Sequence, residues 1–121
     1  MDKKKILIID DEQAILDMYS AALGNFGVIT AGNGEEGLRI ARKEKPDLIY
    51  LDIIMPQLNG LDVLKKLKAD QATSEIPVIL LTNLPEEASA DKAKALGAED
   101  YFVKVNYEPE KLAEATKKIL G

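Results

Sequence analysis

Two reactive residue types are missing from the 121-residue sequence, which contains no cysteine and no histidine. The absence of cysteine excludes disulfide bonds and thiolate chemistry within the chain. The absence of histidine removes the side chain that most often serves as a general base or a metal ligand in proteins. Any chemistry must therefore come from carboxylates, hydroxyl groups, lysines and the backbone.

Long apolar runs are also missing. The run Ile6–Ile9 ends at Asp10 and Asp11, so it is too short for the core of a signal peptide and far too short for a membrane span. We therefore expect a cytoplasmic protein with no membrane insertion. The net charge of −5 argues against direct nucleic-acid binding, which requires a basic surface. With 46% hydrophobic and 31% charged residues, the chain is expected to form one globular domain, residues 1–121.

Segments with strand-like and helix-like patterns alternate along the chain. The short strand-like segments, rich in β-branched or aromatic residues, are 5–10, 28–32, 47–52, 77–82 and 100–104. The segments with helical spacing of apolar residues are 12–24, 34–44, 61–67, 85–96 and 112–119, the last with Leu112, Ala115 and Ile119 as its inner face. Four of the five strand-like segments are almost entirely apolar, which is typical of strands buried on both faces. The alternation predicts an α/β fold with right-handed crossovers and an open, doubly wound, five-stranded parallel sheet covered by five helices.

Functional side chains stand at the ends of four of the five predicted strands. The first strand ends in Asp10 and Asp11, the third in Asp52, the fourth in Thr82 and the fifth in Lys104. The carboxyl ends of parallel strands meet along one edge of the sheet, where proteins of this class bind their ligands. A single acid after a strand is most often a turn residue. Four strands that end in functional side chains on one edge indicate a binding or reaction site instead.

Three carboxylates that converge on one edge repel one another unless a cation lies between them. Mg²⁺ suits such a site because it takes oxygen ligands and keeps water molecules for a phosphate. An aspartate can also attack phosphorus and form an acyl phosphate, while the metal neutralises charge on the phosphoryl oxygens. In this arrangement Lys104 pairs with one phosphoryl oxygen and Thr82 donates its hydroxyl to another. The residues therefore predict a phosphoryl-transfer site.

Four motifs give the sequence a resemblance to a known family. They are LIIDDE with Asp10 and Asp11, LDIIMPQLNG with Asp52, ILLTN with Thr82, and AEDYFVKV with Lys104. In order, spacing and strand context they resemble the receiver domain of two-component response regulators over essentially the whole chain. The resemblance implies the flavodoxin-like fold, with strand order 2-1-3-4-5 and five helices.

The resemblance also implies a role for each acid. Asp52 is the expected phosphoacceptor. Mg²⁺, with Mn²⁺ as a substitute, is expected to bind Asp10, Asp11, Asp52 and the backbone carbonyl of Ile54. The expected donor is a phosphohistidine on a sensor histidine kinase or a histidine phosphotransfer protein, which agrees with the absence of histidine from this chain. Gly60, in the loop after Asp52, is expected to have a positive φ, which glycine adopts without strain.

Two further roles follow from the resemblance, phosphoryl stabilisation by Thr82 and Lys104 and a conformational switch formed by Thr82 and Tyr101. Tyr101 lies three positions before Lys104, where the family has an aromatic side chain that turns inward as the hydroxyl residue moves toward the phosphate. Core packing is the competing interpretation for Tyr101. A downstream partner is expected to bind the face formed by helix 85–96, strand 100–104 and the last helix.

Three features depart from the usual pattern of the family. Val105 replaces the proline that usually follows the lysine, and a trans peptide bond is expected because a cis bond without proline costs about 2.5–4 kcal/mol. The stretch 104–112 is one residue longer than the usual connection. Asn83 stands where a smaller residue is usual, so it is expected to limit the access of water or of a donor to the phosphoryl site.

Three other functions are alternatives. A Mg²⁺-dependent phosphatase with an aspartyl-phosphate intermediate would have a second acid two positions after Asp52, where this chain has Ile54. A flavodoxin-like mononucleotide binder would need a phosphate-binding loop after the first strand, where the acidic sequence DDEQ stands. A receiver-like scaffold that is never phosphorylated would lack part of the acid set, which this chain keeps. We therefore expect a phosphorylation-dependent signalling switch rather than a turnover enzyme.

Overall fold

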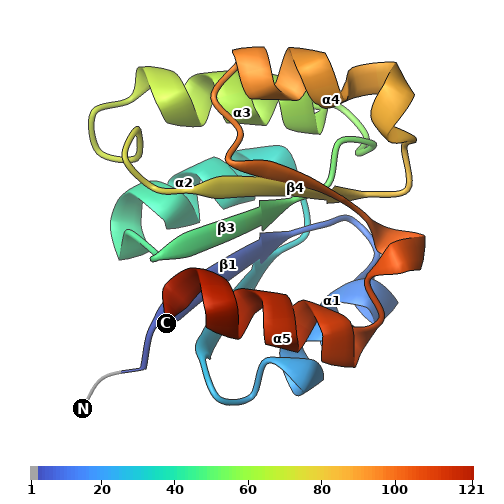
Figure 1. Cartoon of the computed structure of the whole chain (residues 1–121). Coiled ribbons are helices and arrows are strands. Elements are labelled where there is room, and N and C mark those ends of the chain that lie inside the picture. Colours follow the sequence, from blue (N-terminus) through green and yellow to red (C-terminus); the bar gives the residue numbers. More distant parts are fainter. Residues whose placement is uncertain (1–2) are drawn as a thin grey trace.

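The computed structural model describes residues 3–121, which form one parallel sheet covered by helices (Figure 1). The strands are β1 (Lys5–Ile9), β2 (Gly27–Ala31), β3 (Leu48–Leu51), β4 (Val78–Thr82) and β5 (Asp100–Val103). The helices are α1 (Gln13–Ala22), α2 (Gly34–Glu44), α3 (Gly60–Ala69), α4 (Glu86–Ala95) and α5 (Pro109–Leu120), with a short 3₁₀ helix, η1, at Lys104–Asn106. The strand order is β2-β1-β3-β4-β5 and every pairing is parallel, so the predicted doubly wound, flavodoxin-like fold is confirmed.

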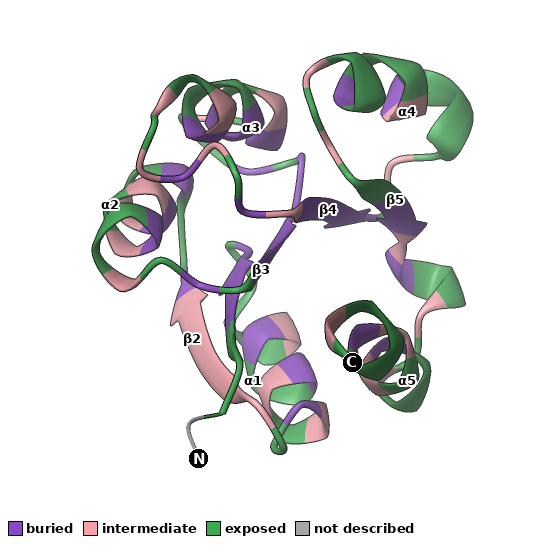
Figure 2. Ribbon diagram, turned by 60° about the vertical axis from the view of Figure 1, so that its left-hand side comes forward, coloured by how far each residue is buried: buried purple, intermediate pink, exposed green. Residues whose placement is uncertain are grey.

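The sheet lies between two layers of helices. α1 and α5 cover one face, and α2, α3 and α4 cover the other (Figure 1). Side chains of β1 alternate between the two cores: Leu7 and Ile9 pack with α2 and α3, and Ile6 and Ile8 pack with α1 and α5. The central strands β1, β3 and β4 are therefore buried on both faces, whereas the edge strand β2 is mostly half-buried (Figure 2). This confirms the apolar runs as strands of a parallel sheet.

The inner face of α5 differs from the prediction at one position. Leu112 is fully buried as expected, but Ile119 is 40% exposed, and Thr116 is fully buried. Thr116 is tolerated in the core because its hydroxyl donates to the carbonyl of Leu112 at 2.7 Å and accepts the hydroxyl of Tyr50 at 2.7 Å. A buried hydroxyl with both partners costs little. The spacing of apolar residues alone therefore pointed to the wrong side chain.

The loop between β3 and α3 corrects a second expectation. Gly60 does not have a positive φ; the left-handed residue of this loop is Gln57, with a φ of 69°. Gly60 is needed for space instead, because a Cβ atom there would lie 2.6 Å from the Cα of Ile53 and would collide with the carbonyl oxygen of Asp52. The N–H of Gly60 donates to the carbonyl of Ile53 at 2.8 Å, which closes the loop against the end of β3. The prediction named the right residue for the wrong reason.

Every peptide bond within residues 3–121 is trans, including the bond between Lys104 and Val105, as predicted. Among the helices of the described residues, none has the length and apolar character that crossing a membrane requires.

Candidate functional site

The register of the central strands brings Asp10 and Asp52 side by side. Ile9, the last residue of β1, pairs with Leu51, the last residue of β3. The pairing extends beyond the strands, because the N–H of Asp52 donates to the carbonyl of Ile9 at 3.0 Å. Asp10 and Asp52 therefore leave neighbouring strands at the same level of the sheet. The two acids meet because neighbouring parallel strands end in register at one edge of the sheet.

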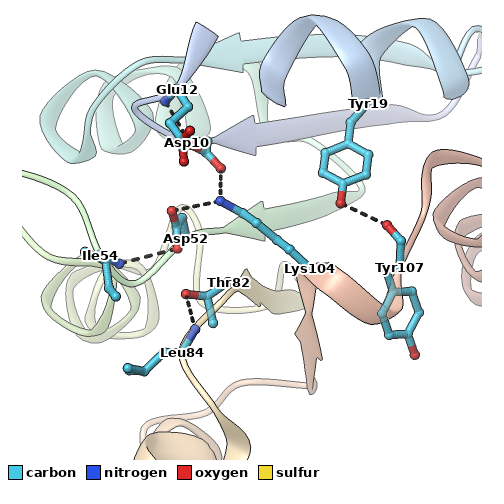
Figure 3. Close-up of polar contacts among 9 residues, drawn as sticks. All are labelled: Asp10, Glu12, Tyr19, Asp52, Ile54, Thr82, Leu84, Lys104 and Tyr107. Atoms are coloured by element: carbon cyan, nitrogen blue, oxygen red, sulfur yellow. Dashed lines mark hydrogen bonds and ion pairs between the residues drawn. The ribbon is translucent and has the colours of Figure 1, made fainter. Parts of the chain in front are cut away.

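Asp11 completes a cluster of three carboxylates. One side-chain oxygen from each of Asp10, Asp11 and Asp52 lies within 4.8 Å of the other two. Asp10 and Asp52 are buried, and Asp11 is exposed. Backbone N–H groups support the buried pair, since Glu12 donates to Asp10 at 2.9 Å and Ile54 donates to Asp52 at 3.4 Å (Figure 3). Such converging oxygens suit a hard cation such as Mg²⁺.

Lys104 places a positive charge between two of these acids. Its ammonium nitrogen lies 2.7 Å from Oδ2 of Asp10 and 3.1 Å from Oδ2 of Asp52 (Figure 3). Burial alone would lower the pKa of Lys104, but its hydrogen bond to Asp10 and the charges of both acids outweigh burial and raise it. Burial also raises the pKa of Asp10, against the lowering effects of Lys104 and of the Glu12 N–H. Lys104 is therefore charged at neutral pH and is held against the acidic cluster.

A cavity of about 280 Å³ opens beside the cluster. It is lined by Asp11, Glu12, Asp52, Ile54, Thr82, Asn83 and Lys104. This volume lies near the lower end of the range for ligand pockets, so it suits a small group such as a phosphoryl group with its water molecules. Thr82 accepts the N–H of Leu84 at 3.3 Å, which leaves its own O–H to donate. Asn83 follows Thr82 directly and is exposed at the wall of the cavity.

Tyr101 does not line this cavity, although β5 leads directly to Lys104. Its side chain is buried, and its hydroxyl donates to the carbonyl of Leu84 at 2.8 Å. A second hydrogen bond, also of 2.8 Å, joins this hydroxyl to Ser89 in α4. Leu84 is thus the only residue between Tyr101 and Thr82 in the hydrogen-bonded chain. Tyr101 is both packed in the core and connected to the strand end that carries Thr82.

Sequence reasoning missed three supporting residues. Glu12 supports Asp10 through its backbone, and no side-chain pattern signals such a contact. Tyr19 follows the apolar spacing of the first helix, but its hydroxyl donates to the carbonyl of Tyr107, and its partner lies 88 positions away. Ser89 lies in an Ala-rich helix whose weak periodicity did not predict which residues face inward.

The sequence of the chain matches known proteins over most of its length. Residues 6–117 match the family model for the response regulator receiver domain. The chain is 40% identical over 119 residues to the alkaline phosphatase synthesis transcriptional regulatory protein PhoP of Bacillus subtilis (strain 168), in a match that covers 97% of this chain and 48% of PhoP. It is 41% identical over 102 residues to protein PilH of Pseudomonas aeruginosa, in a match that covers 83% of this chain and 84% of PilH. The chain therefore spans about half the length of PhoP and most of PilH.

Solved structures share the whole architecture. The chemotaxis protein CheY4 of Vibrio cholerae superposes with a TM-score of 0.88 at 29% identity, over 97% of this chain and 98% of that protein. The response regulator DrrB of Thermotoga maritima, described as an OmpR/PhoB homologue, superposes with a TM-score of 0.84 at 33% identity. The DrrB match covers 98% of this chain and 52% of that protein. Both likenesses span nearly all of this chain.

Proposed function

Because the chain belongs to the response regulator receiver domain family, we propose that it is a single receiver domain, residues 1–121, whose phosphoacceptor is Asp52. Phosphorylation of an aspartate is the characteristic reaction of these two-component regulators. The observation that carries the choice of Asp52 is its position: it is a buried carboxylate that also lines the cavity and meets the ammonium of Lys104. Asp10 is buried but is not part of the cavity lining, and Asp11 is exposed.

In the proposed reaction a carboxylate oxygen of Asp52 attacks the phosphorus of a phosphohistidine. The new P–O bond forms as the P–N bond to the donor imidazole breaks, and the imidazole leaves with the electron pair of that bond. Lys104 pairs with an oxygen of the arriving phosphoryl group, since its ammonium already lies beside Asp52. Thr82 donates its hydroxyl to another phosphoryl oxygen. The products are an acyl phosphate on Asp52 and an unphosphorylated histidine on the donor.

Asp10, Asp11 and Asp52, with the backbone carbonyl of Ile54, are proposed to hold Mg²⁺, or Mn²⁺ in its place. The three carboxylate oxygens within 4.8 Å of one another support this proposal, and Ile54 lines the adjoining cavity. When bound, the ion neutralises negative charge on the phosphoryl oxygens. The N–H of Glu12 orients Asp10 within this set of ligands.

The partners follow from the family and from the surface next to the site. The donor is a sensor histidine kinase or a histidine phosphotransfer protein. Thr82 and Tyr101 form the switch, and a downstream partner binds the face of α4, β5 and α5, to which Tyr101 is joined through Ser89. PhoP is by name a transcriptional regulator, but the net charge of −5 disfavours contact between this chain and nucleic-acid phosphates. The direct partner is therefore a protein.

The chain acts as a signalling switch, with self-catalysed phosphotransfer and slow autodephosphorylation as its only chemistry. A Mg²⁺-dependent phosphatase is not favoured, because Ile54 stands two positions after Asp52, where that mechanism needs a second acid. The Ile54 side chain is 61% exposed at the rim of the cavity and offers no proton to a leaving group.

Incubation with acetyl phosphate and MgCl₂, followed by intact-mass measurement, tests this function. The wild type is expected to gain a phosphoryl adduct that is stable in acid and lost in base, and to gain none when EDTA replaces MgCl₂. Asp52→Asn is expected to gain no adduct. Asp62→Asn, at an exposed acid in the first turn of α3, is the matched control and should behave as the wild type. An adduct on Asp52→Asn contradicts the assignment, and continuous phosphate release at high turnover supports the phosphatase.

A further inference from the structure

Lys104 is carried by a segment with little stability of its own. It is the first residue of η1, a 3₁₀ helix of three residues that is closed by a 2.9 Å hydrogen bond from the N–H of Tyr107 to the carbonyl of Lys104. Hydrogen-bond geometry in such short 3₁₀ turns is poor. Val105, in the middle of the turn, is 75% exposed and gives the turn no anchor in the core. The backbone that carries Lys104 therefore depends on contacts from outside the turn.

Tyr19 supplies one such contact from α1. Its side chain is 1% exposed, and its hydroxyl donates to the carbonyl oxygen of Tyr107 at 2.9 Å (Figure 3). The bond joins α1 to Tyr107, the residue directly after η1. Burial raises the pKa of Tyr19, with the nearby charge of Lys104 opposing this shift and that of Asp10 adding to it. Tyr19 is therefore a neutral donor at neutral pH.

The ring of Tyr107 supplies a second contact. It stacks on Phe102 in β5, with ring centroids 4.0 Å apart and an interplanar angle of 6°. The ammonium of Lys111, in α5, lies 4.9 Å from the centre of the Tyr107 ring. Aromatic stacking and a cation over a ring both stabilise such an arrangement. The carbonyl and the ring of Tyr107 are thus fixed to different elements, so the end of η1 is held from two sides.

We propose that Tyr19 is a positioning residue for phosphoryl transfer and that it acts through Lys104, an inference that rests on the function proposed above. The hydroxyl of Tyr19 fixes the end of η1 and thereby the backbone from which Lys104 reaches Asp10 and Asp52. Without this hydroxyl, the carbonyl of Tyr107 loses its partner and the turn gains freedom. Lys104 then spends less time beside Asp52, where the phosphoryl group must be stabilised.

The first test does not depend on phosphorylation. It follows the Cε–Hε NMR correlation of Lys104, assigned by its loss in Lys104→Met, in protein treated with EDTA. Tyr19→Phe removes the hydroxyl and keeps the ring, and it is expected to shift this signal. Tyr50→Phe is the matched control, because it also removes a buried hydroxyl bond, the one to Thr116, and should leave the signal in place. Tyr107→Leu removes the stacked ring, keeps the carbonyl and should shift the same signal.

The second test is a double-mutant cycle on the rate of adduct formation with acetyl phosphate and Mg²⁺. In the otherwise wild-type protein, Tyr19→Phe is expected to slow adduct formation by about threefold to tenfold, the effect of losing about one hydrogen bond. In the Lys104→Met background the same change should have little effect, because the residue through which Tyr19 acts is gone. An equal factor in both backgrounds, or a Lys104 signal that neither Tyr19→Phe nor Tyr107→Leu moves, overturns the proposal. A wild type that forms no adduct counts against the proposed function, while the NMR signal still decides the role of Tyr19.

Discussion

Thr82 and Tyr101 are linked through a single residue, Leu84. The N–H of Leu84 donates to the hydroxyl oxygen of Thr82 at 3.3 Å, and its carbonyl accepts the hydroxyl of Tyr101 at 2.8 Å. Because the proton of Tyr101 is used in the bond to Leu84, Ser89 must be the donor in its 2.8 Å bond to the Tyr101 oxygen. The backbone of Leu84 therefore connects the two side chains of the proposed switch.

Tyr101→Phe should destabilise the protein by about 1–2 kcal/mol, because it keeps the ring but removes both hydrogen bonds. Ser89→Ala removes one of the two and should cost about half as much. Urea unfolding followed by circular dichroism gives both values. Ser74→Ala, at a side chain with no hydrogen bond within residues 3–121, is the control and should change the unfolding free energy by less than about 0.5 kcal/mol. Equal stability of Tyr101→Phe and the wild type would show that the hydroxyl does not hold the side chain inward.

Gly60→Ala should destabilise the protein by about 1–3 kcal/mol, because its methyl group would push against the backbone at Asp52 and Ile53. The displaced Asp52 should also be phosphorylated more slowly. Gly32→Ala is the matched control, since no atom lies within 4 Å of a Cβ at that position. Unfolding free energies and adduct formation rates of the two variants check this prediction. Equal unfolding free energies and equal rates for the two variants would contradict the prediction.

Stability should fall at alkaline pH in part because of Tyr50. Burial raises the pKa of Tyr50 from 10.0 to about 12, against the lowering effect of its bond to Thr116. The native state then holds the proton more tightly than the unfolded chain, so this contribution to stability is complete below pH 10.0 and is lost as the pH rises toward about 12. The full loss of unfolding free energy from this group is about 2–3 kcal/mol.

Tyr50→Phe removes this titrating group. It should be less stable than the wild type at neutral pH by about 1 kcal/mol, the value of the lost hydrogen bond. Its unfolding free energy should then fall less steeply between neutral pH and about pH 11. Urea unfolding at both pH values measures the two slopes. If the unfolding free energies of the wild type and of Tyr50→Phe fell by the same amount, the result would contradict the raised pKa of Tyr50.

Asn83→Ala should speed both phosphorylation by acetyl phosphate and loss of the phosphoryl group to water. Asn83 lines the cavity beside Asp52, so a smaller side chain opens the approach to that carboxylate. A gain of about twofold to tenfold corresponds to removing up to about 1.4 kcal/mol of steric hindrance from the transition state. Time courses of the intact mass measure both rates. Asn25→Ala, at an exposed asparagine outside this cavity, is the control. If Asn83→Ala had the same rates as the wild type, Asn83 would not limit access to Asp52.

The meeting of the acids was predictable because it follows from topology. Asp10 and Asp52 each come directly after an apolar strand, and strand ends of a parallel sheet share one edge. The turn at Lys104 was not predictable in the same way. The segment 100–104 continues the strand pattern, but β5 ends at Val103, and Lys104 begins η1, from which it reaches two acids. Those acids belong to distant segments, so no local pattern contains the signal.

The sequence did not predict the hydrogen-bond partners of the buried hydroxyls, because these partners also lie in distant segments of the chain. A tyrosine at helical spacing predicts a core position, and Tyr19 has one. Which carbonyl its hydroxyl meets depends on how α1 packs against the segment after β5, a contact between residues 88 positions apart. Thr116 shows the converse case, since a polar residue in α5 is buried only because Tyr50 and Leu112 supply its partners.

Chemical mapping of the phosphorylated residue tests the assignment of Asp52 as the phosphoacceptor. The wild type is phosphorylated with acetyl phosphate and Mg²⁺ and then treated with sodium borohydride, which reduces an aspartyl phosphate to homoserine. Peptide mass spectrometry then locates the homoserine. Homoserine is expected in place of Asp52, with unchanged aspartates at positions 10 and 11. Homoserine in place of Asp10 or Asp11, with Asp52 unchanged, would contradict this assignment.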